Sequence, residues 1–451
     1  MTNNPRKAAL YVLNELYKNN QTLDNTIDKI FQKGLELSKK DMALFHALVY
    51  GVLRWRARLD LIIDHFSKTR INKINPNVLN ILRLGLFQII FMDRIPVSAA
   101  VNTSVELAKS SSAPWIKGFV NGLLRNASQN YENVSYPSPD KDPVSYIAAI
   151  KSFPQWLVKR WAGRFGIEET KELCDEINKI PLLTIRTNTL KTTPGRLADS
   201  LQQDTGEIIL TKFSPQGLSL KGLDKPVPEL QAYKDGWFQV QDEAAQLVTH
   251  MVNPLPGMAV LDACAGLGGK TGHMAQQMKN IGQITALDNS LEKLNSLKKD
   301  MARLGVSIVN TYVHDLSIPP DINQIKTFDR ILLDAPCSGL GVISRNPDTK
   351  WAESKKNLTR YQQRQIKFLS SLVHLLKPSG TLTYSVCSTE PEENEMVIKE
   401  FLNKYPAFKI KNNYSTLCEP IKNLINTKGC LKTLPHKNKM DGFFCAVLQN
   451  H

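Results

Sequence analysis

Short apolar runs alternate with longer stretches of helical spacing in the second half of the chain. Buried strands that alternate with helices are typical of a doubly wound, mostly parallel sheet. In such a sheet a ligand binds beyond the carboxyl ends of the strands. The sequence therefore predicts an α/β domain over residues 238–451, with its site at that edge of the sheet. The apolar runs are 259–261, 284–287, 331–333 and 382–386, and helical stretches include 291–304 and 358–376.

A different pattern covers the first 130 residues. Apolar side chains recur there at helical spacing, as at Leu10, Leu13 and Leu16, and no stretch alternates as a half-buried strand would. The segment YENVSYPSPDKDPV at 131–144 is rich in Pro, Ser and Asp, which is typical of a linker. These features predict an all-α domain at 1–130 followed by a short connection.

Residues 145–237 mix the two patterns. Apolar spacing predicts a helix at 154–165, and two further runs predict strands at 182–188 and 213–220. We therefore expect a small α+β module between the helical domain and the α/β domain. A multidomain chain is also what a length of 451 residues favours.

The charge of the chain favours a polyanionic partner. Its formal net charge is +15, and residues 1–130 hold 18 Lys and Arg against 9 Asp and Glu, so +9 of the total lies in under a third of the chain. A basic surface is the electrostatic footprint of nucleic-acid binding. The stretch RWRAR at 54–58 has side chains that suit phosphate contacts and stacking. A helix face with solvated arginines and an inward-packed Trp55 is the simpler interpretation of that stretch.

Targeting and redox features predict a cytoplasmic protein without a membrane anchor. The N-terminal MTNNPRKAAL lacks the apolar core of a secretory signal. The most apolar stretch, 79–92, is interrupted by Asn80, Arg83 and Gln88, and it is shorter than the roughly 20 apolar residues that span a bilayer. Seven cysteines without paired spacing are typical of reduced thiols.

A glycine-rich turn follows the first apolar run of the α/β domain. The stretch LDACAGLGGKT at 261–271 passes from a predicted strand into a predicted helix, and its glycines would let the backbone approach a ligand closely. It matches neither the G-x-G-x-x-G dinucleotide fingerprint nor a phosphate-binding P-loop. Asp288 ends the next run, about 20 residues after Gly266, where an acid suits ribose hydroxyls. With Asp315 after the third strand, these features favour an adenosine-type cofactor without phosphates, which points to S-adenosylmethionine.

Two later strands end in thiols. The stretch FDRILLDAPCSG at 328–339 places Asp334 and Cys337 at the end of one strand, and YSVCSTEPEEN at 384–394 places Cys387 at the end of the next. Neighbouring parallel strands would bring both sulfurs to the same edge of the sheet. The spacing from Thr389 to Glu392 predicts a capping box that starts a helix and fixes the loop of Cys387. The positive end of that helix would favour a thiolate.

Two thiols and an acid beside a methyl donor suit methylation of a pyrimidine at carbon 5. That carbon is too weak a nucleophile to take a methyl group directly. A thiolate that adds to carbon 6 makes carbon 5 enamine-like and reactive. After methyl transfer, a base must remove the carbon 5 proton so that the thiol can leave.

These motifs resemble the RNA cytosine-C5 methyltransferases of the Fmu/Sun/NOL1 type. The resemblance rests on LDACAGLGGKT, FDRILLDAPCSG, YSVCSTEPEEN and FQVQDEAAQL at 238–247, and it extends over the whole chain. The stretches LRLGLFQIIFMDRIPVSAAVNTSVELAK at 82–109 and FVNGLLRN at 119–126 resemble a NusB-type RNA-binding domain. The resemblance implies a NusB-like domain, a Rossmann-like methyltransferase domain and S-adenosylmethionine as the cofactor. It also implies a monomer whose partner is 16S ribosomal RNA or a small-subunit precursor.

The resemblance implies a role for each motif residue. Cys387 would attack carbon 6 of the cytosine, Cys337 would assist release, and Asp334 would hold the base near N3 and border the cofactor. The glycine-rich turn and the acids would bind the methyl donor. The implied cofactor-binding residues are Cys264, Ala265, Gly266, Leu267, Gly268, Gly269, Lys270, Asp288, Asp315 and Asp334.

This chain departs from the family pattern at three positions. Gly266 and Leu267 stand where the usual turn, CAAPGGKT, has alanine and proline. Val386 stands where a threonine usually precedes the nucleophile, so a hydrogen bond from that hydroxyl is lost while the shape is kept. The thiols, glycines, lysine and acids of the pattern remain, and we therefore expect the activity to remain.

The other cysteines are assigned structural roles. Cys174 lies in a predicted helix and is expected in the core, and Cys445 is expected in a final strand at 443–448. Irregular gaps separate the cysteines and the histidine after residue 410, so no metal site is expected.

Three other functions are alternatives. A non-catalytic RNA-binding factor would keep the helical domain active and the sheet as a relic, but the intact Cys337 and Cys387 argue against it. A cytosine methyltransferase for transfer RNA would share the same catalytic half, and only the N-terminal domain argues for ribosomal RNA. An NAD-dependent oxidoreductase would need the dinucleotide fingerprint that is missing.

Overall fold

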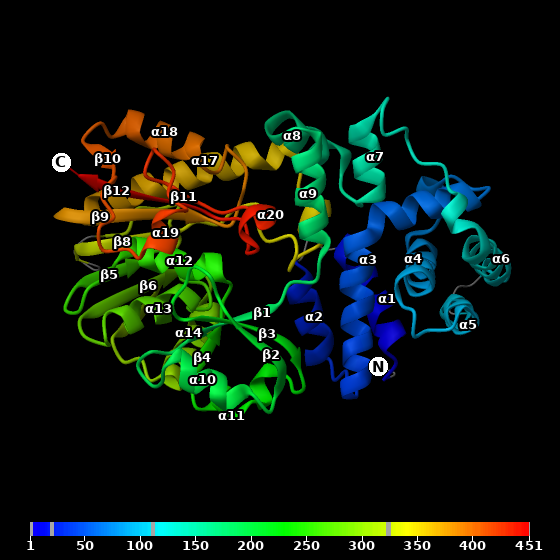
Figure 1. Cartoon of the computed structure of the whole chain (residues 1–451), viewed down its shortest axis with the longest axis horizontal. Coiled ribbons are helices and arrows are strands. Elements are labelled where there is room, and N and C mark those ends of the chain that lie inside the picture. Colours follow the sequence, from blue (N-terminus) through cyan, green and yellow to red (C-terminus); the bar gives the residue numbers. More distant parts are fainter. Residues whose placement is uncertain (1–2, 19–21, 110–112, 322–325, 451) are drawn as a thin grey trace. The chain divides into compact units, whose positions relative to one another are not determined.

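The computed structural model describes residues 3–18, 22–109, 113–321 and 326–450 of the chain. It divides into two compact units (Figure 1). The first unit comprises Met1–Lys179 and Ile343–Glu353, and the second comprises Ile180–Val342 and Ser354–His451. The predicted domain limits at 130, 144 and 237 differ from this division, because the helices up to Asn178 pack with the first unit. Those limits stay predictions.

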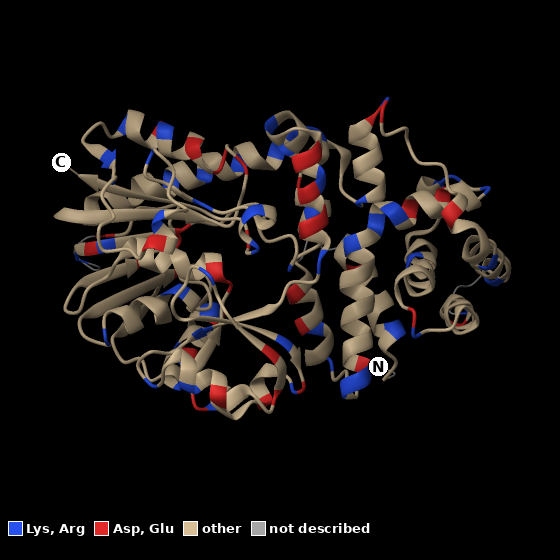
Figure 2. Ribbon diagram, viewed as in Figure 1, with Lys and Arg blue, Asp and Glu red and all other residues tan. Residues whose placement is uncertain are grey.

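The first unit is helical, as its apolar spacing predicts. Leu13, Leu48 and Leu82, one from each of three helices, are at most 1% exposed. Figure 2 shows Lys and Arg on several of its helices, including α3 and α6. Its longer helices are α1 Pro5–Lys18, α2 Leu23–Gln32, α3 Lys39–Phe66, α4 Pro76–Phe91, α5 Val97–Ala108, α6 Trp115–Asn130, α7 Pro143–Ile150, α8 Gln155–Phe165 and α9 Ile167–Asn178, and the short α16 spans Thr349–Ala352.

The arginine-rich stretch at 54–58 has a structural role in α3. Trp55 interrupts the helix with φ −107° and ψ 15°, and its ring stacks on Phe91 with the centroids 4.8 Å apart. The guanidinium Nη2 of the buried Arg54 donates to the Ser344 carbonyl at 2.6 Å. The inward packing of Trp55 is confirmed, whereas Arg54 is not the solvated side chain that the sequence suggested.

The segment Ile343–Glu353, which closely follows the Cys337 motif in sequence, belongs to the first unit. Its Lys350 is fully buried, and its ammonium donates to the carbonyls of Arg54 and Ser152, both at 2.8 Å. Burial holds the pKa of Lys350 well below its ordinary value, and the ammonium lies 3.9 Å from the ring centroid of Phe153. Deleting the N-terminal helices would therefore leave this segment without its partners.

A four-stranded antiparallel sheet opens the second unit, as expected for a small α+β module. Its order is β2-β3-β1-β4. The strand predicted from residue 213 begins only at Gly217, because the amides of Phe213 and Ser214 turn to donate to the Glu243 carboxylate at 2.5 and 2.8 Å. The elements are β1 Leu183–Thr187, α10 Pro194–Leu201, β2 Thr205–Leu210, β3 Gly217–Leu223, α11 Gln231–Lys234 and β4 Phe238–Val240.

The main sheet of the second unit has the order β10-β12-β9-β8-β5-β6-β7, and the short β11 pairs with β12. β7, β6, β5, β8 and β9 run parallel, β12 pairs antiparallel with β9, and β10 pairs antiparallel with β12. The doubly wound α/β prediction is thus confirmed. Its strands are β5 Ala259–Asp262, β6 Gln283–Asp288, β7 Val309–Val313, β8 Phe328–Asp334, β9 Leu376–Val386, β10 Phe408–Ile410, β11 Leu431–Lys432 and β12 Phe444–Asn450.

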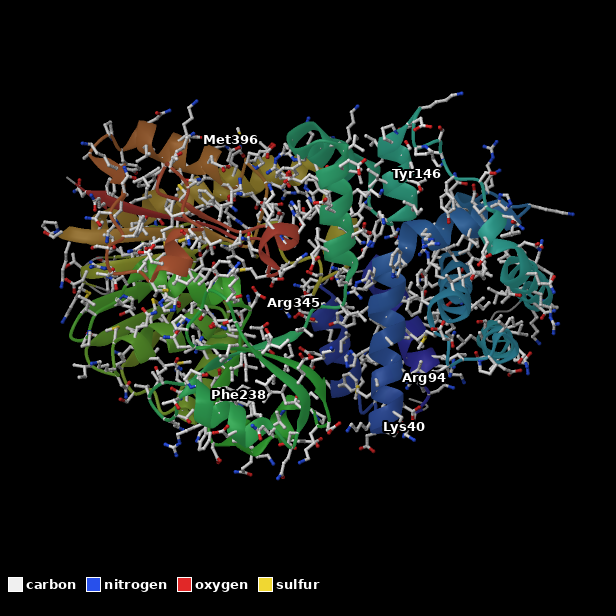
Figure 3. All side chains as sticks on the ribbon, in the orientation of Figure 1. Lys40, Arg94, Tyr146, Phe238, Arg345 and Met396 are labelled. Carbon is white, nitrogen blue, oxygen red and sulfur yellow. The ribbon has the colours of Figure 1, made fainter. Side chains whose placement is uncertain are left out.

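Helices cover this sheet, and side chains fill the space between the layers (Figure 3). Phe238, labelled there, is fully buried, whereas Met396 is 45% exposed. Cys174 and Cys445 are both fully buried, as predicted. The helices are α12 Glu243–Val252, α13 Gly269–Gln277, α14 Leu291–Leu304, α17 Lys355–Leu372, α18 Glu395–Lys404, α19 Glu419–Lys422 and α20 Pro435–Asn438.

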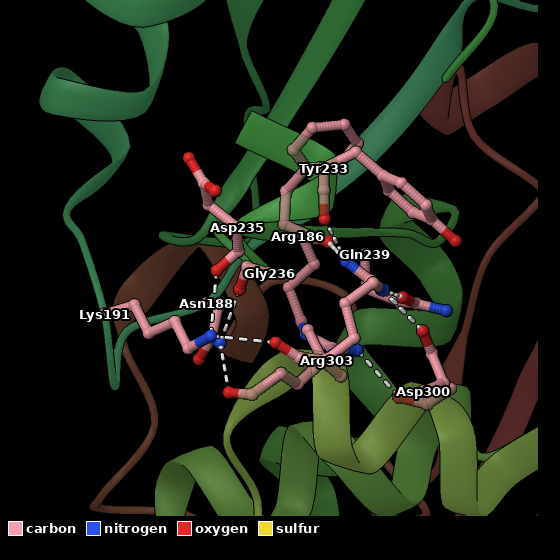
Figure 4. Close-up of polar contacts among 12 residues, drawn as sticks. Arg186, Asn188, Lys191, Tyr233, Asp235, Gly236, Gln239, Asp300 and Arg303 are labelled. Carbon is pink, nitrogen blue, oxygen red and sulfur yellow. Dashed lines mark hydrogen bonds and ion pairs between the residues drawn. The ribbon is translucent and has the colours of Figure 1, made fainter. Parts of the chain in front are cut away.

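Polar contacts join the small module to α14 within the second unit (Figure 4). Arg303, near the end of α14, donates to the Tyr233 carbonyl at 2.8 Å and pairs with Asp300 at 2.6 Å. Asn188 donates to the Leu304 carbonyl at 2.8 Å, and Lys191 donates to the Arg303 carbonyl at the same distance. The last carbonyls of α14 are therefore satisfied by side chains of the module, which fixes this helix against it.

In the ranges that the structure describes, no helix combines the length and the apolar character that a bilayer crossing needs.

Candidate active site

A pocket of about 810 Å³ lies at the carboxyl ends of β5, β6, β8 and β9, where the sequence predicted the site. The structure brings the two predicted ends of the site together, since one pocket holds the acids of the cofactor end and both thiols. Of the predicted residues, those that line it are Cys264, Gly266, Asp288, Asp315, Asp334, Cys337 and Cys387. Those that lie behind or beside the lining are Ala265, Leu267, Gly268, Gly269 and Lys270.

Two glycines shape the turn between β5 and α13. Gly266 has φ +56° and Gly268 has φ +86°, which L side chains rarely adopt. A Cβ on Gly268 would come within 2.6 Å of the Leu297 side chain, whereas a Cβ on Gly266 would meet nothing within 4 Å. Gly268 is thus required by packing, and the replacement of the usual alanine by Gly266 leaves open space beside the pocket.

Asp288 joins the turn to the start of α14. One carboxylate oxygen accepts from the Gly266 amide at 3.0 Å, and the other accepts from the Ser290 amide at 2.9 Å. The side chain still lines the pocket. Asp315 lines the same pocket from an exposed position after β7, and hydrogen bonds from Ser317 lower the pKa of its carboxyl.

The small module also supports the glycine turn. Arg186 of β1 is fully buried, and its guanidinium donates to the Gly269 carbonyl at 2.7 Å and to the Gln276 side chain at 3.1 Å. The same guanidinium bonds Gln241. Burial lowers the pKa of Arg186 to about 9, so it remains a cation at neutral pH. Nothing in the sequence distinguished Arg186, because its partners come from two distant segments, α13 and the residue after β4.

Asp262 lies beneath the turn and carries a strongly shifted pKa. Its carboxylate accepts from the Thr271 hydroxyl at 2.7 Å. Burial raises the pKa of Asp262 to about 7, and the nearby carboxylate of Asp334 adds to that rise.

This shift predicts a pH-dependent difference between the protein and Asp262→Asn. Between the ordinary pKa of 3.8 and about 7, the folded state holds a proton that the unfolded state loses. The stabilising contribution of this carboxyl is present below 3.8 and is lost as the pH rises through about 7. Asp262→Asn lacks this titration. The difference in melting temperature, variant minus parent, should therefore increase as the pH rises across this interval. Parallel melting profiles from pH 4 to 8 would contradict the shift.

The two thiols face each other at the pocket. β8 and β9 pair in parallel with Asp334 opposite Ser385, and the Cys337 and Cys387 sulfurs lie 3.1 Å apart. The hydrogen bond with Cys387, together with burial, raises the pKa of Cys337 well above its ordinary value. Cys337 therefore keeps its proton and can donate it to the sulfur of Cys387.

A partly buried ion pair borders the thiols. Lys270 Nζ and Asp334 Oδ2 are 2.5 Å apart, and the Ser385 hydroxyl donates to the other oxygen of Asp334 at 2.6 Å. Burial lowers the pKa of Lys270, but Asp334 and the nearby Cys387 raise it by more, so the net shift is upward. The ammonium of Lys270 therefore lies beside the Asp334 carboxylate and near Cys387.

The predicted capping box after Cys387 is wrong. Residues 391–394 form a turn, and α18 begins only at Glu395. Glu393 is instead fully buried, and its carboxylate accepts from the Ser338 amide at 2.9 Å and from the Ser388 hydroxyl at 2.6 Å. Proline and acids at the start of a helix are a local pattern, and here a distant loop competes for the carboxylate.

Glu393 connects the two thiol-bearing loops. It also accepts from the Ser338 hydroxyl at 2.5 Å and from the Gln365 amide of α17 at 3.1 Å. The sequence did hold one signal for this role: a serine follows each of the two motif cysteines, at Ser338 and Ser388. Both serines donate to the same carboxylate, which sets the position of both loops.

Family models match all three parts of the chain. The model described as "16S rRNA methyltransferase RsmB/F" matches residues 249–449, and the NusB family model matches residues 3–129. A model described as "Methyltr_RsmF/B-like, ferredoxin-like domain" matches residues 153–227.

Relatives of similar length resemble the whole chain. "Probable ribosomal RNA small subunit methyltransferase B" of Synechocystis is 36% identical over 98% of this chain and 99% of its own length. "Ribosomal RNA small subunit methyltransferase B" of Escherichia coli is 31% identical over 99% and 98%, respectively. The crystal structure of the protein PH0851 matches with a TM-score of 0.81 and 27% identity, over 100% of this chain and 99% of that one. The chain therefore belongs to the ribosomal RNA small subunit methyltransferase B family, whose members are S-adenosylmethionine-dependent 16S rRNA methyltransferases.

Proposed function

We propose that this protein transfers a methyl group from S-adenosylmethionine to carbon 5 of a cytosine in 16S ribosomal RNA, through a covalent bond between Cys387 and carbon 6. The observation that carries the proposal is the pair of sulfurs 3.1 Å apart in the pocket that Asp288 and Asp315 also line. This reaction needs a second thiol beside the nucleophilic one, to remove the carbon 5 proton, whereas a simpler methyl transfer would not need it.

The cofactor end of the pocket fits the methyl donor. The carboxylates of Asp288 and Asp315 can accept hydrogen bonds from the hydroxyl and amino groups of an adenosine. The positive φ of Gly266 and the open space where its Cβ would be let a ligand approach the backbone closely. When bound, S-adenosylmethionine supplies an electrophilic methyl group.

Cys387 would begin the reaction. Lys270 places its ammonium near the Cys387 sulfur, where it would offset the charge of the attacking sulfur. The thiolate forms the S–C6 bond, and the electron pair of the C5=C6 double bond moves to carbon 5. Carbon 5 then takes the methyl group. To expose carbon 6 to the sulfur, the base must leave its stack and enter the pocket.

Cys337 would complete the reaction. Its pKa is raised chiefly by the hydrogen bond with Cys387, and the charge on Cys387 adds to this. Once Cys387 is bonded to carbon 6 it carries no charge, so that cause disappears, and Cys337 can release its own proton to solvent and then take the carbon 5 proton. Removal of the carbon 5 proton then restores the C5=C6 double bond and expels Cys387 as thiolate. Asp334, held by Lys270 and Ser385, would orient the cytosine near N3.

Methyl transfer to defined RNAs tests this function. Protein and labelled S-adenosylmethionine should place label in an unmodified 16S rRNA transcript, and bisulfite sequencing should show one new 5-methylcytosine. Label in a transfer RNA transcript instead would favour the transfer RNA enzyme. No label in either, with RNA bound, would favour a non-catalytic RNA-binding factor.

Asp288 gives a test of the cofactor end. Asp288→Ala should weaken S-adenosylmethionine binding by roughly ten- to a hundredfold, since a buried polar group left without its partner costs about 1–3 kcal/mol. Calorimetric titration measures this change. Glu292→Ala, an exposed carboxylate in the first turn of α14, is the control and should bind as the parent does. Equal affinity of Asp288→Ala and the parent would limit Asp288 to its bonds with Gly266 and Ser290.

A further inference from the structure

One face of α17 is basic and borders the active-site pocket. Arg360, Arg364 and Lys367 recur at the spacing that puts side chains on one face of a helix, and all three are exposed. These three side chains line the same pocket as Cys337 and Cys387. The cofactor-binding turn and the thiol motifs do not include them, and the sequence pattern did not single them out.

The charge of this face is offset only in part: Lys367 lies near Asp315 and helps to lower the pKa of that carboxyl. α17 contains no Asp or Glu, and its first turn carries Lys355 and Lys356, although cations are disfavoured at the positive end of a helix. Among the residues that the structure describes, none forms an ion pair with Arg360 or Arg364. Figure 2 shows Lys and Arg along this helix. Two guanidinium groups without an ion-pair partner beside a reaction site indicate an anionic ligand.

The basic face is held in a fixed position relative to the thiols. Gln365, next to Arg364, is fully buried, and its amide donates to the Pro336 carbonyl and to Glu393, both at 3.1 Å. Pro336 immediately precedes Cys337, and Glu393 accepts from the serines beside both thiols. One side of α17 is therefore bonded to the catalytic loops while the other presents cations at the pocket.

A second, smaller hollow lies on the outer side of the same arginines. It measures about 220 Å³ and is lined by Asn357, Arg360, Tyr361 and Arg364. Arg360 and Arg364 line both hollows, so the two adjoin at these side chains, and the smaller one is called the outer hollow. The guanidinium of Arg364 also lies 5.2 Å from the ring centroid of Tyr361. A ring, an amide and two guanidinium groups are the side chains that hold a nucleotide.

We propose that the outer hollow binds the nucleotide next to the target cytosine, with Arg360 and Arg364 on the phosphate that joins the two. This inference rests on the proposed function. A base that turns into the pocket carries its backbone to the pocket mouth, and guanidinium groups there can bind the phosphate in a bidentate manner. Tyr361 offers its ring to the neighbouring base. The cations thus hold the strand in the flipped geometry.

The test compares three double variants of the full chain on an unmodified 16S rRNA transcript. Arg360→Ala with Arg364→Ala removes both guanidinium groups, Arg360→Lys with Arg364→Lys keeps the charge, and Lys298→Ala with Lys299→Ala removes two exposed cations of α14 as the control. RNA affinity is measured over a series of KCl concentrations. Binding of S-adenosylmethionine and the melting temperature are measured on each variant.

The alanine pair should bind the transcript about ten- to a hundredfold more weakly, and the salt dependence should lose about 0.7 in slope, which is the value for one phosphate of a single strand. The lysine pair should recover the slope but only part of the affinity, because it lacks the planar fork. S-adenosylmethionine binding should not change. The control pair should match the parent in slope.

Two results would overturn the inference. If the alanine pair keeps the RNA affinity and the salt dependence of the parent, Arg360 and Arg364 do not contact the phosphate. Weaker S-adenosylmethionine binding with unchanged RNA binding would assign the face to the cofactor. If the proposed function itself is wrong, the result differs from both of these, because the parent protein would then leave the transcript unmethylated. The inference can thus fail while the parent still methylates.

Discussion

Cys337→Ala is expected to leave the protein covalently joined to its RNA, whereas Cys387→Ala is expected to abolish both the adduct and methylation. Without Cys387 no S–C6 bond forms, and methyl transfer should fall by at least about a thousandfold, because removing a covalent nucleophile leaves only positioning. Without Cys337 the bond forms and carbon 5 takes its methyl group, but the carbon 5 proton leaves slowly. The S–C6 bond then persists.

A denaturing gel measures both outcomes. Cys337→Ala with the 16S rRNA transcript and S-adenosylmethionine should give a slow band that ribonuclease removes, and the double variant should give none. Cys174→Ala, a buried cysteine of the first unit, is the matched control and should behave as the parent. An adduct with Cys387→Ala and none with Cys337→Ala would reverse the two roles. Parent-like methylation in both variants would make the cysteines merely part of the core.

Glu393→Ala is expected to lower the rate of methyl transfer by about a hundredfold, since small displacements of reacting groups can cost that much. The substitution leaves the Ser338 amide, the Ser388 hydroxyl and the Gln365 amide without their shared acceptor. Both thiol loops then lose their common support. Buried donors without partners should also lower the free energy of unfolding by about 2–4 kcal/mol.

Adduct formation separates positioning from stability. In the Cys337→Ala background and below the melting transition, Glu393→Ala should slow the appearance of the covalent band without lowering its final yield. Glu400→Ala, an exposed carboxylate of α18, is the control. In the same background it should form the band as fast as Cys337→Ala alone. A destabilised variant that forms the band at an unchanged rate would make Glu393 purely structural.

The sequence predicted the elements of the second unit well where the signal is local. The helix expected at 291–304 is α14 in full, and the runs ending at 261, 287, 333 and 386 end in β5, β6, β8 and β9. Apolar periodicity reports which face of an element is buried, and that choice depends on neighbours along the chain. Apolar periodicity placed the start of β3 at residue 213 instead of Gly217, because the Glu243 carboxylate holds the preceding residues in a turn.

Of the features that depend on contacts between distant residues, the sequence predicted one and missed others. The meeting of Cys337 and Cys387 could be predicted, because parallel neighbouring strands end at the same edge. The role of Glu393 could not, since an acid after a proline favours a helix start equally well. Arg186 and the segment Ile343–Glu353 also gave no local signal, because their partners come from other parts of the chain.

The sequence by itself determined the class of fold, the edge of the sheet at which the site lies, and the thiols and acids that meet there. Only the tertiary structure decided what holds them: Glu393 between the two thiol loops, Lys270 against Asp334, and the basic face of α17 at the pocket mouth. The physical reason is that periodicity and turn chemistry act over a few residues. The partner of a buried charge is chosen by strand order and helix packing, which bring together residues that no local pattern connects.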